Sequence, residues 1–228
     1  MKQIHFLSAL ALAVLLTCTL GSCSGGSKSG GDDSLNGDSS VVVEQVVEKS
    51  KYGVDLGLSV NWADHNVGAE KPEDVGVRIP LGNVSGTIKA PSKVRSNISD
   101  TDQDIAKVKW GDGWRMPTGP EFQELFEECE WIKEPLNGHN GFRVVGPNGN
   151  SIFLPVTGDA YMAESTSQYD IVMPEKPSPT HTEGNYWFAS RANDRYGCNH
   201  LTFNTDTGKV QMMIAQDYFI MSIRPVHD

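Results

Sequence analysis

Basic residues and cysteines are scarce in this sequence. Its 228 residues contain 19 lysines and arginines against 29 aspartates and glutamates, which gives a formal net charge of −10 at pH 7. Proteins that bind nucleic acids or anionic lipid surfaces through charge need a basic patch, so this balance argues against both classes. The composition is 38% hydrophobic and includes 5 Trp and only 4 Cys. This supplies enough apolar surface for a folded core.

Sequence motifs of catalysis and metal binding are missing as well. The chain has no Gly-x-Ser-x-Gly element, no phosphate-binding Walker loop and no His-Glu-x-x-His pattern. Asp100, Asp102 and Asp104 alternate like the start of an EF-hand loop, but Ile105 and Gly111 stand where that loop needs Gly and Glu. We therefore expect no metal ion, no cofactor and no catalytic function.

No apolar run is long enough to predict a membrane-spanning helix. The run from Phe6 to Leu16 follows Lys2 and is shorter than the roughly 20 residues that span a bilayer, which is typical of a secretory signal. Residues 20–23, Leu-Gly-Ser-Cys, resemble the lipobox of bacterial lipoproteins, in which cleavage exposes a cysteine whose sulfur takes a diacylglycerol. We predict lipidation at Cys23 and anchoring in the bacterial cell envelope, at the outer membrane. The alternative is an ordinary signal peptide with an incidental cysteine.

A stretch of low complexity follows the predicted lipidation site. Residues 24–40 are mostly Ser, Gly and Asp, which have little to bury, so this stretch predicts a flexible tether. Residues 41–50 fit a strand or a helix, because a short apolar run does not distinguish the two. We predict three parts, namely a signal peptide over 1–22, a tether over 23–50 and one folded domain over 51–228.

Two helices are predicted in the folded domain. The clearer one covers 119–130, where Thr118 and Glu121 form a capping box and Pro120 lies in the first turn. Its predicted buried face consists of residues at helical spacing, namely Phe122, Leu125, Phe126 and Cys129. A shorter helix is predicted over 103–109, with Ile105 and Val108 facing inward.

Strands are predicted before and after these helices. Apolar and polar residues alternate from Val54 to Val60, which predicts a half-buried strand. Two turn-forming segments, 146–150 and 204–208, each lie between β-prone runs and predict hairpins. The stretch from Tyr218 to Val226 predicts a final strand.

Two long stretches predict irregular structure. Residues 70–99 are rich in Pro, Gly, Asn and Ser, with room for one short hairpin. Residues 157–185 form a second stretch, and a loop of that length in a compact domain is often functional. Its aromatic and sulfur-containing side chains are candidates for ligand binding, namely Tyr161, Met162, Tyr169 and Met173, together with Tyr186 directly after it. The alternative is a loop packed by its own side chains.

The order of several segments resembles the major paralogous domain family first named from Fibrobacter, and surface lipoproteins of Bacteroidetes. The matching segments are Val54–Ala69, Pro72–Asp74, Val108–Thr118, Glu121–Trp131, Gly141–Pro155, Tyr186-Trp187 and Ser222–Val226. The resemblance implies an α+β domain with the C-type-lectin-like fold, in which two helices pack on a small twisted antiparallel sheet with long irregular loops. The calcium-binding sequence patterns of C-type lectins are not present.

One motif also resembles a related branch of that fold, the formylglycine-generating enzymes. The shared element is Arg115-Met116-Pro117-Thr118, and we interpret it as structural. Trp110 and Trp114 are then core aromatics, Arg115 is buried against a carboxylate, and Pro117 and Thr118 begin the helix that contains Glu121. The enzymatic alternative needs a late pair of reactive cysteines, whereas only Cys198 lies late in the domain.

Cys129 and Cys198 are the cysteines that remain in the folded domain. An exported protein can form disulfides, and this bridge would close a loop of about 70 residues. Two separate buried thiols are the alternative. The resemblance and the absent motifs together predict a recognition domain that binds a glycan or an envelope protein. A structural subunit of a surface complex and a formylglycine-generating-like enzyme are the alternatives.

Overall fold

The computed structural model describes residues 52–87, 93–158, 161–162, 180–191, 197–216 and 219–228. The predicted signal peptide, the lipidation site Cys23 and the predicted tether lie outside these residues. Tyr169 and Met173 of the predicted binding loop also lie outside them. No helix within the described ranges is long and apolar enough to cross a membrane.

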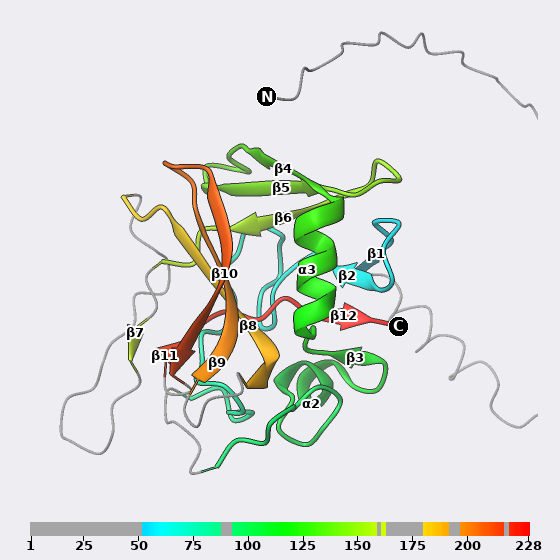
Figure 1. The fold of residues 1–228 in the computed structure, drawn as a ribbon, viewed down its shortest axis with the longest axis vertical. Coiled ribbons are helices and arrows are strands. Elements are labelled where there is room, and N and C mark those ends of the chain that lie inside the picture. The colour runs from blue at the N-terminus through cyan, green and yellow to red at the C-terminus, as the bar shows by residue number, and fades with distance from the viewer. Residues whose placement is uncertain (1–51, 88–92, 159–160, 163–179, 192–196, 217–218) are drawn as a thin grey trace, which may run out of the picture. The chain divides into compact units, whose positions relative to one another are not determined.

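The described strands form small antiparallel sheets (Figure 1). The first sheet has the order β1 (Gly53–Val54), β2 (Asn61–Ala63), β12 (Val226–His227) and β3 (Trp114–Arg115). The second has the order β4 (Glu130–Lys133), β5 (Gly141–Val145) and β6 (Ser151–Pro155). The third has the order β10 (Lys209–Gln216), β9 (Gly197–Asn204) and β8 (Glu183–Arg191), and β11 (Phe219–Ile220) pairs with β7 (Tyr161–Met162). With two helices in the described residues, the fold is of the α+β class, as predicted.

The predicted main helix is confirmed as α3 (Gly119–Glu128). The Glu121 carboxylate accepts hydrogen bonds from the backbone N–H and the hydroxyl of Thr118, at 2.7 and 2.9 Å, which fixes the start of the helix. Phe122 and Leu125 are fully buried, whereas Phe126 is 40% exposed, so the buried face is narrower than predicted. Phe122 stacks on Phe188 of β8, and this contact joins the helix to the third sheet (Figure 1).

The predicted shorter helix is present as α2 (Ile105–Trp110). Asp104 begins it, because its carboxylate accepts from the N–H groups of Ala106 and Lys107. Its other oxygen accepts from the Met116 N–H at 2.8 Å, which ties α2 to the chain that follows β3. The prediction that Val108 faces inward is wrong, since Val108 is 48% exposed and the buried residues are Ile105 and Ala106.

The strand predicted from Val54 to Val60 is also wrong. β1 ends at Val54, and the chain then bends until β2 begins at Asn61. Gly57 has φ +77°, a left-handed conformation that no strand contains, and its N–H donates to the Asp55 carboxylate at 2.7 Å. The alternation predicted burial correctly for Leu56 and Val60, but it did not predict the backbone conformation.

The predicted hairpins are both confirmed. β5 pairs with β6, and β9 pairs with β10 over eight consecutive residue pairs. The predicted final strand is interrupted, because β11 and β12 are separate and residues 223–225 between them belong to no strand. β4 and β8 were not predicted, and β8 shortens the predicted loop 157–185 at its C-terminal end.

β8 separates two hydrophobic cores. Tyr186 and Phe188 pack in the core that contains α3, and Trp187 and Ala189 pack in a second core. The second core takes its apolar side chains largely from the segment predicted to be irregular, including Ile79, Leu81, Val94 and Ile98. Residues 70–87 and 93–99 indeed contain no helix or strand, but the Trp187 indole holds them by donating to the Ile79 carbonyl at 2.9 Å.

Arg224 is fully buried and connects three distant segments. Its guanidinium donates to the Asn66 side-chain oxygen at 2.7 Å, to the Ala63 carbonyl at 3.0 Å and to the Phe153 carbonyl at 2.8 Å. Asn66 is itself buried and donates to the Val75 carbonyl at 3.0 Å. Burial lowers the pKa of Arg224 to about 10, so the side chain is still charged at neutral pH.

We expect Arg224→Met to lower the free energy of unfolding by about 3–5 kcal/mol, because three buried acceptors lose their charged donor. Urea unfolding followed by tryptophan fluorescence measures this change. Arg143→Met is the matched control, since Arg143 forms a half-exposed pair with Glu134 and should cost less than about 1 kcal/mol. Equal losses in the two variants would contradict the role given to Arg224.

Candidate functional site

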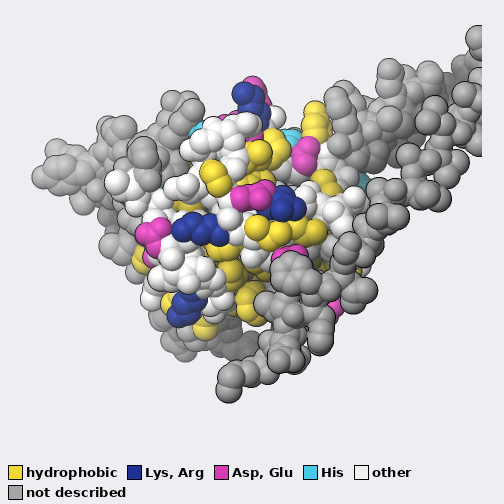
Figure 2. Space-filling view, turned by 90° about the horizontal axis from the view of Figure 1, so that it is seen from above, with side chains coloured by type: hydrophobic (Ala, Val, Ile, Leu, Met, Phe, Trp, Pro, Cys, Tyr) yellow, Lys and Arg dark blue, Asp and Glu magenta, His cyan; other side chains and the backbone are white. Residues whose placement is uncertain are grey.

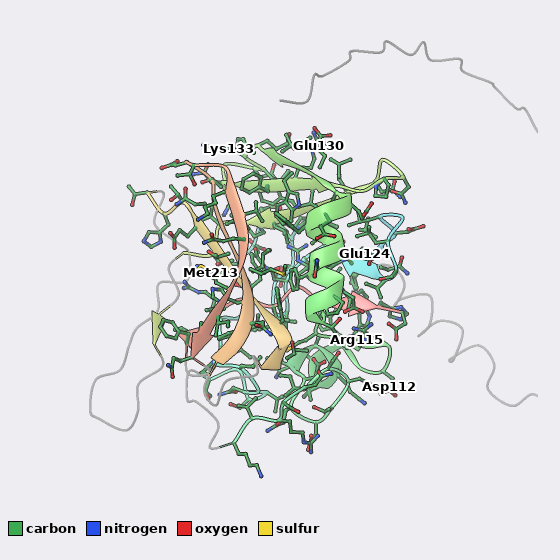
Figure 3. The ribbon with its side chains drawn as sticks, viewed as in Figure 1. Asp112, Arg115, Glu124, Glu130, Lys133 and Met213 are labelled. Atoms are coloured by element: carbon green, nitrogen blue, oxygen red, sulfur yellow. The ribbon has the colours of Figure 1, made fainter. Side chains whose placement is uncertain are left out.

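One face of the third sheet gathers polar side chains from three strands. The strand register aligns Glu183, Asn204 and Lys209 in one row, and Asn185, Thr202 and Gln211 in the next. A third row consists of Trp187, His200 and Met213. Because side chains two residues apart in a strand point to the same side, all three rows face the same way. Figure 3 shows Met213 on the side of β10 that faces away from α3.

A shallow pocket of about 200 Å³ lies over the first two rows. Its lining residues are Glu183, Thr202, Phe203, Asn204, Thr207, Lys209 and Gln211. The pocket therefore presents a carboxylate, an ammonium group, amides and hydroxyls within a small area. It thus offers both donors and acceptors of hydrogen bonds.

Asn204 forms the turn at the end of the pocket. Its side-chain oxygen accepts from the N–H groups of Asp206 and Thr207, both at 3.0 Å, and its amide donates to the Thr182 hydroxyl at 3.1 Å. These bonds occupy both the oxygen and the amide of the Asn204 side chain within the hairpin. The other polar side chains that line the pocket are those of Glu183, Thr202, Thr207, Lys209 and Gln211, and the Gln211 amide donates to the Met213 sulfur at 3.0 Å.

The two ends of the long segment 159–179 are fixed beside this pocket. The Thr157 and Gly158 N–H groups both donate to the Glu183 carbonyl at 3.0 Å, and the Thr205 N–H donates to the Thr182 carbonyl at 2.8 Å. The segment predicted to bind a ligand therefore leaves and rejoins the sheet next to the pocket. Tyr161 and Met162 form β7 against β11, and their side chains lie outside the described residues.

Tyr186 is not a loop residue, contrary to the prediction. It lies in β8, is fully buried, and its hydroxyl donates to the Pro155 carbonyl at 2.7 Å. Burial raises the pKa of this tyrosine far above its usual value. Its position follows from the length of β8, which begins at Glu183 and carries Tyr186 into the core.

The motif around Arg115 contains the predicted contact between an arginine and a carboxylate. The guanidinium of Arg115, which is labelled in Figure 3, contacts the carboxylates of Glu121 and Asp228 at 2.6 Å each. Burial tends to raise the pKa of Glu121, but the hydrogen bonds from Arg115 and Thr118 outweigh it and lower that pKa. The side chain of Trp114 is fully buried, and that of Trp110 is partly buried. The two indole rings pack edge to face, with 4.8 Å between their ring centroids. Pro117 is buried just before the helix.

Cys129 lies at the end of α3 as a half-buried free thiol. Burial, and then the charges of Glu124 and Glu128, raise its pKa to about 11. The thiol is therefore protonated at neutral pH, when it is a weak nucleophile. The side chain of Cys198 in β9 lies outside the described residues, and the structure gives no support to a disulfide between the two.

His200 occupies the third row and is nearly buried, with 6% of its surface exposed. Its Nδ1 has no hydrogen-bond partner. The rings of His200 and Trp187 pack edge to face, with 6.0 Å between their centroids. Burial lowers the pKa of His200 to about 4, although a hydrogen bond with the Met213 backbone opposes the shift. The imidazole is therefore neutral at pH 7.

The sequence analysis missed the pocket residues, although one signal was available. The predicted hairpin aligns Thr202 with Gln211 and Asn204 with Lys209 once its turn is fixed, but only β8, which was not predicted, places Glu183 beside Asn204. Among the described residues, no three His, Cys, Asp or Glu side chains are placed to hold a metal ion. No protein-family model, curated protein or solved structure matches the chain.

We expect His200 to make the stability depend on pH. The unfolded chain takes up a proton near pH 6.5, whereas the folded chain resists it down to about pH 4, so stability is fully present above pH 6.5 and is lost as the pH falls. Between pH 7.5 and 5 this loss is about 2 kcal/mol.

Urea unfolding at a series of pH values measures this slope, which His200→Gln should flatten. His139→Gln is the control and should keep the wild-type slope, since His139 lies in the separate turn after β4. A slope unchanged by His200→Gln would contradict the assignment.

Proposed function

We propose that this chain is an exported protein of the bacterial outer membrane, lipid-anchored at Cys23, whose domain over 51–228 binds a glycan without catalysis. The observation that carries the proposal is the polar pocket on the third sheet, with both ends of segment 159–179 fixed beside it. A small polar pocket on a sheet, next to the two fixed ends of a long segment, is suited to recognition.

The chemistry of the pocket favours a sugar. Sugar hydroxyls both donate and accept hydrogen bonds, and the pocket offers carboxylate, amide, hydroxyl and ammonium groups to them. Its volume of about 200 Å³ is below the range of pockets for drug-sized ligands, so it suits one ring or one branch of a larger glycan. Met213 in the third row is 46% exposed and offers an apolar contact beyond the polar rows.

Further features support a non-catalytic domain of C-type-lectin-like architecture. The domain contains small antiparallel sheets, long segments without regular structure and, among its described residues, two helices. The protonated Cys129 does not suit the thiol chemistry of the formylglycine-generating enzymes. On the face shown in Figure 2, basic, acidic and apolar side chains are intermingled. This face therefore presents no large patch of one charge to a charged ligand.

A structural subunit of a surface complex is the second candidate function. The observation that favours it is the exposure of three consecutive apolar residues in β10, namely Met212, Met213 and Ile214. Met212 and Ile214 face away from the polar rows, so substitutions there test this function separately from substitutions of the pocket residues Lys209 and Gln211.

We expect residues 24–228 to gain thermal stability with one class of dietary or mucin glycan, because a ligand that binds only the folded state adds RT ln(1 + [L]/Kd). Gln211→Ala and Lys209→Ala should each weaken that binding about tenfold, since each removes a hydrogen-bonding group worth about 1–2 kcal/mol. Titration calorimetry measures the affinities.

The matched controls are Gln123→Ala and Lys71→Ala, which change exposed residues outside the pocket and should bind as the wild type does. A glycan whose affinity falls equally in pocket and control variants would rule out the pocket as its site. If no glycan raises the thermal stability, the result would contradict glycan binding and favour the second candidate function.

A further inference from the structure

Two of the methionines whose side chains the structure describes are open to solvent. Met212 is 41% exposed and Met213 is 46% exposed, whereas Met116 and Met221 lie in the second core and are 2% and 1% exposed. A dissolved oxidant has to reach the thioether sulfur to convert it to a sulfoxide. Met212 and Met213 are therefore the described methionines that such an oxidant reaches first.

The two exposed methionines lie on opposite faces of β10. Met213 shares its face with Lys209 and Gln211, which line the pocket, because side chains two residues apart in a strand point the same way. Met212 points to the other face of the sheet. The two methionines are thus similar in exposure, but Met213 adjoins the polar rows and Met212 does not.

The Met213 sulfur is in direct contact with a pocket residue. The side-chain amide of Gln211 donates to this sulfur at 3.0 Å, and Gln211 also lines the pocket. A thioether is a weak acceptor, so this contact leaves the amide available to a stronger acceptor such as a ligand oxygen. The chemical state of the Met213 sulfur therefore decides what the Gln211 amide offers to the pocket.

We propose that Met213 is a site of reversible oxidation by peroxides, and that its oxidised form withdraws the Gln211 amide from the pocket. A hydroperoxide transfers its terminal oxygen to the sulfur. The O–O bond breaks, an S–O bond forms, the sulfur loses two electrons, and the peroxide is reduced to an alcohol or, from hydrogen peroxide, to water. Reduction by a methionine sulfoxide reductase restores the thioether.

Oxidation changes both contacts that Met213 makes possible at this end of the pocket. The sulfoxide oxygen is a stronger acceptor than the thioether sulfur, so it holds the Gln211 amide more firmly. The apolar surface that Met213 offers beyond the polar rows becomes polar at the same time. The affinity for a sugar should then fall about three- to tenfold, the effect of one hydrogen bond. This consequence rests on the proposed function, whereas the oxidation and the capture of the amide do not.

Peptide mapping of residues 24–228 after treatment with hydrogen peroxide tests the site of oxidation. The tryptic peptide that begins at Val210 contains Met212, Met213 and Met221, so its fragment ions compare the three positions in one spectrum. We expect sulfoxide at Met212 and Met213 while Met221 stays reduced, because the folded protein buries Met221. A Met213 that stays reduced while Met212 is oxidised would overturn the proposal.

NMR spectroscopy of the Gln211 side chain tests the capture of its amide. The amide signals are assigned by their loss in Gln211→Ala. We expect peroxide to move a Gln211 amide proton downfield in the wild type and in Met212→Leu, and we expect methionine sulfoxide reductase to reverse the shift.

Met213→Leu is the matched variant, since leucine has a similar volume but no sulfur, and it should abolish the shift. Any effect of oxidised cysteines would persist in this variant. Amide signals that do not move, or that move equally in Met213→Leu, would refute the capture of the amide. Both outcomes are read without a glycan, so they are distinct from a failure of the proposed function.

Discussion

The buried guanidinium of Arg224 is the interaction on which the rest of the fold depends. It binds the Asn66 amide oxygen and the Ala63 carbonyl from one segment and the Phe153 carbonyl from another, and no carboxylate neutralises it among these hydrogen-bond partners. A charge this deeply buried needs such acceptors, so these two segments and the chain around Arg224 have to come together correctly. Through Asn66 the same network reaches the Val75 carbonyl, and so it holds the first turn of the long irregular segment in place.

β8 links this connected framework to the pocket on the third sheet. The side chains of Tyr186 to Ala189 alternate between two cores, which fixes the middle of the strand on both faces. At the start of the strand, Glu183 reaches the pocket with its side chain while its carbonyl holds Thr157 and Gly158. The strand thus joins the buried part of the domain to the polar pocket.

Local chemistry in the sequence predicted local structure well. The capping residues Thr118 and Glu121 predicted the start of α3, and turn-forming residues predicted two hairpins. Predictions of which residues are buried failed at Val108, Phe126 and Tyr186, because tertiary neighbours rather than periodicity decide what covers a side chain. The predicted hairpin already contained the pocket residues of β9 and β10, but the complete pocket could not be predicted, since Glu183 reaches it only through the register of β8 against β9, which pairs residues about twenty positions apart.

The two N–H groups that share the Glu183 carbonyl close the base of segment 159–179 independently of what the segment contains. Closing a longer loop costs little additional entropy, about 0.6 kcal/mol for each doubling of its length. Changes of length or sequence between residues 163 and 179 should therefore leave the two hydrophobic cores in place. The closed base separates the stability of the domain from the sequence of this one segment.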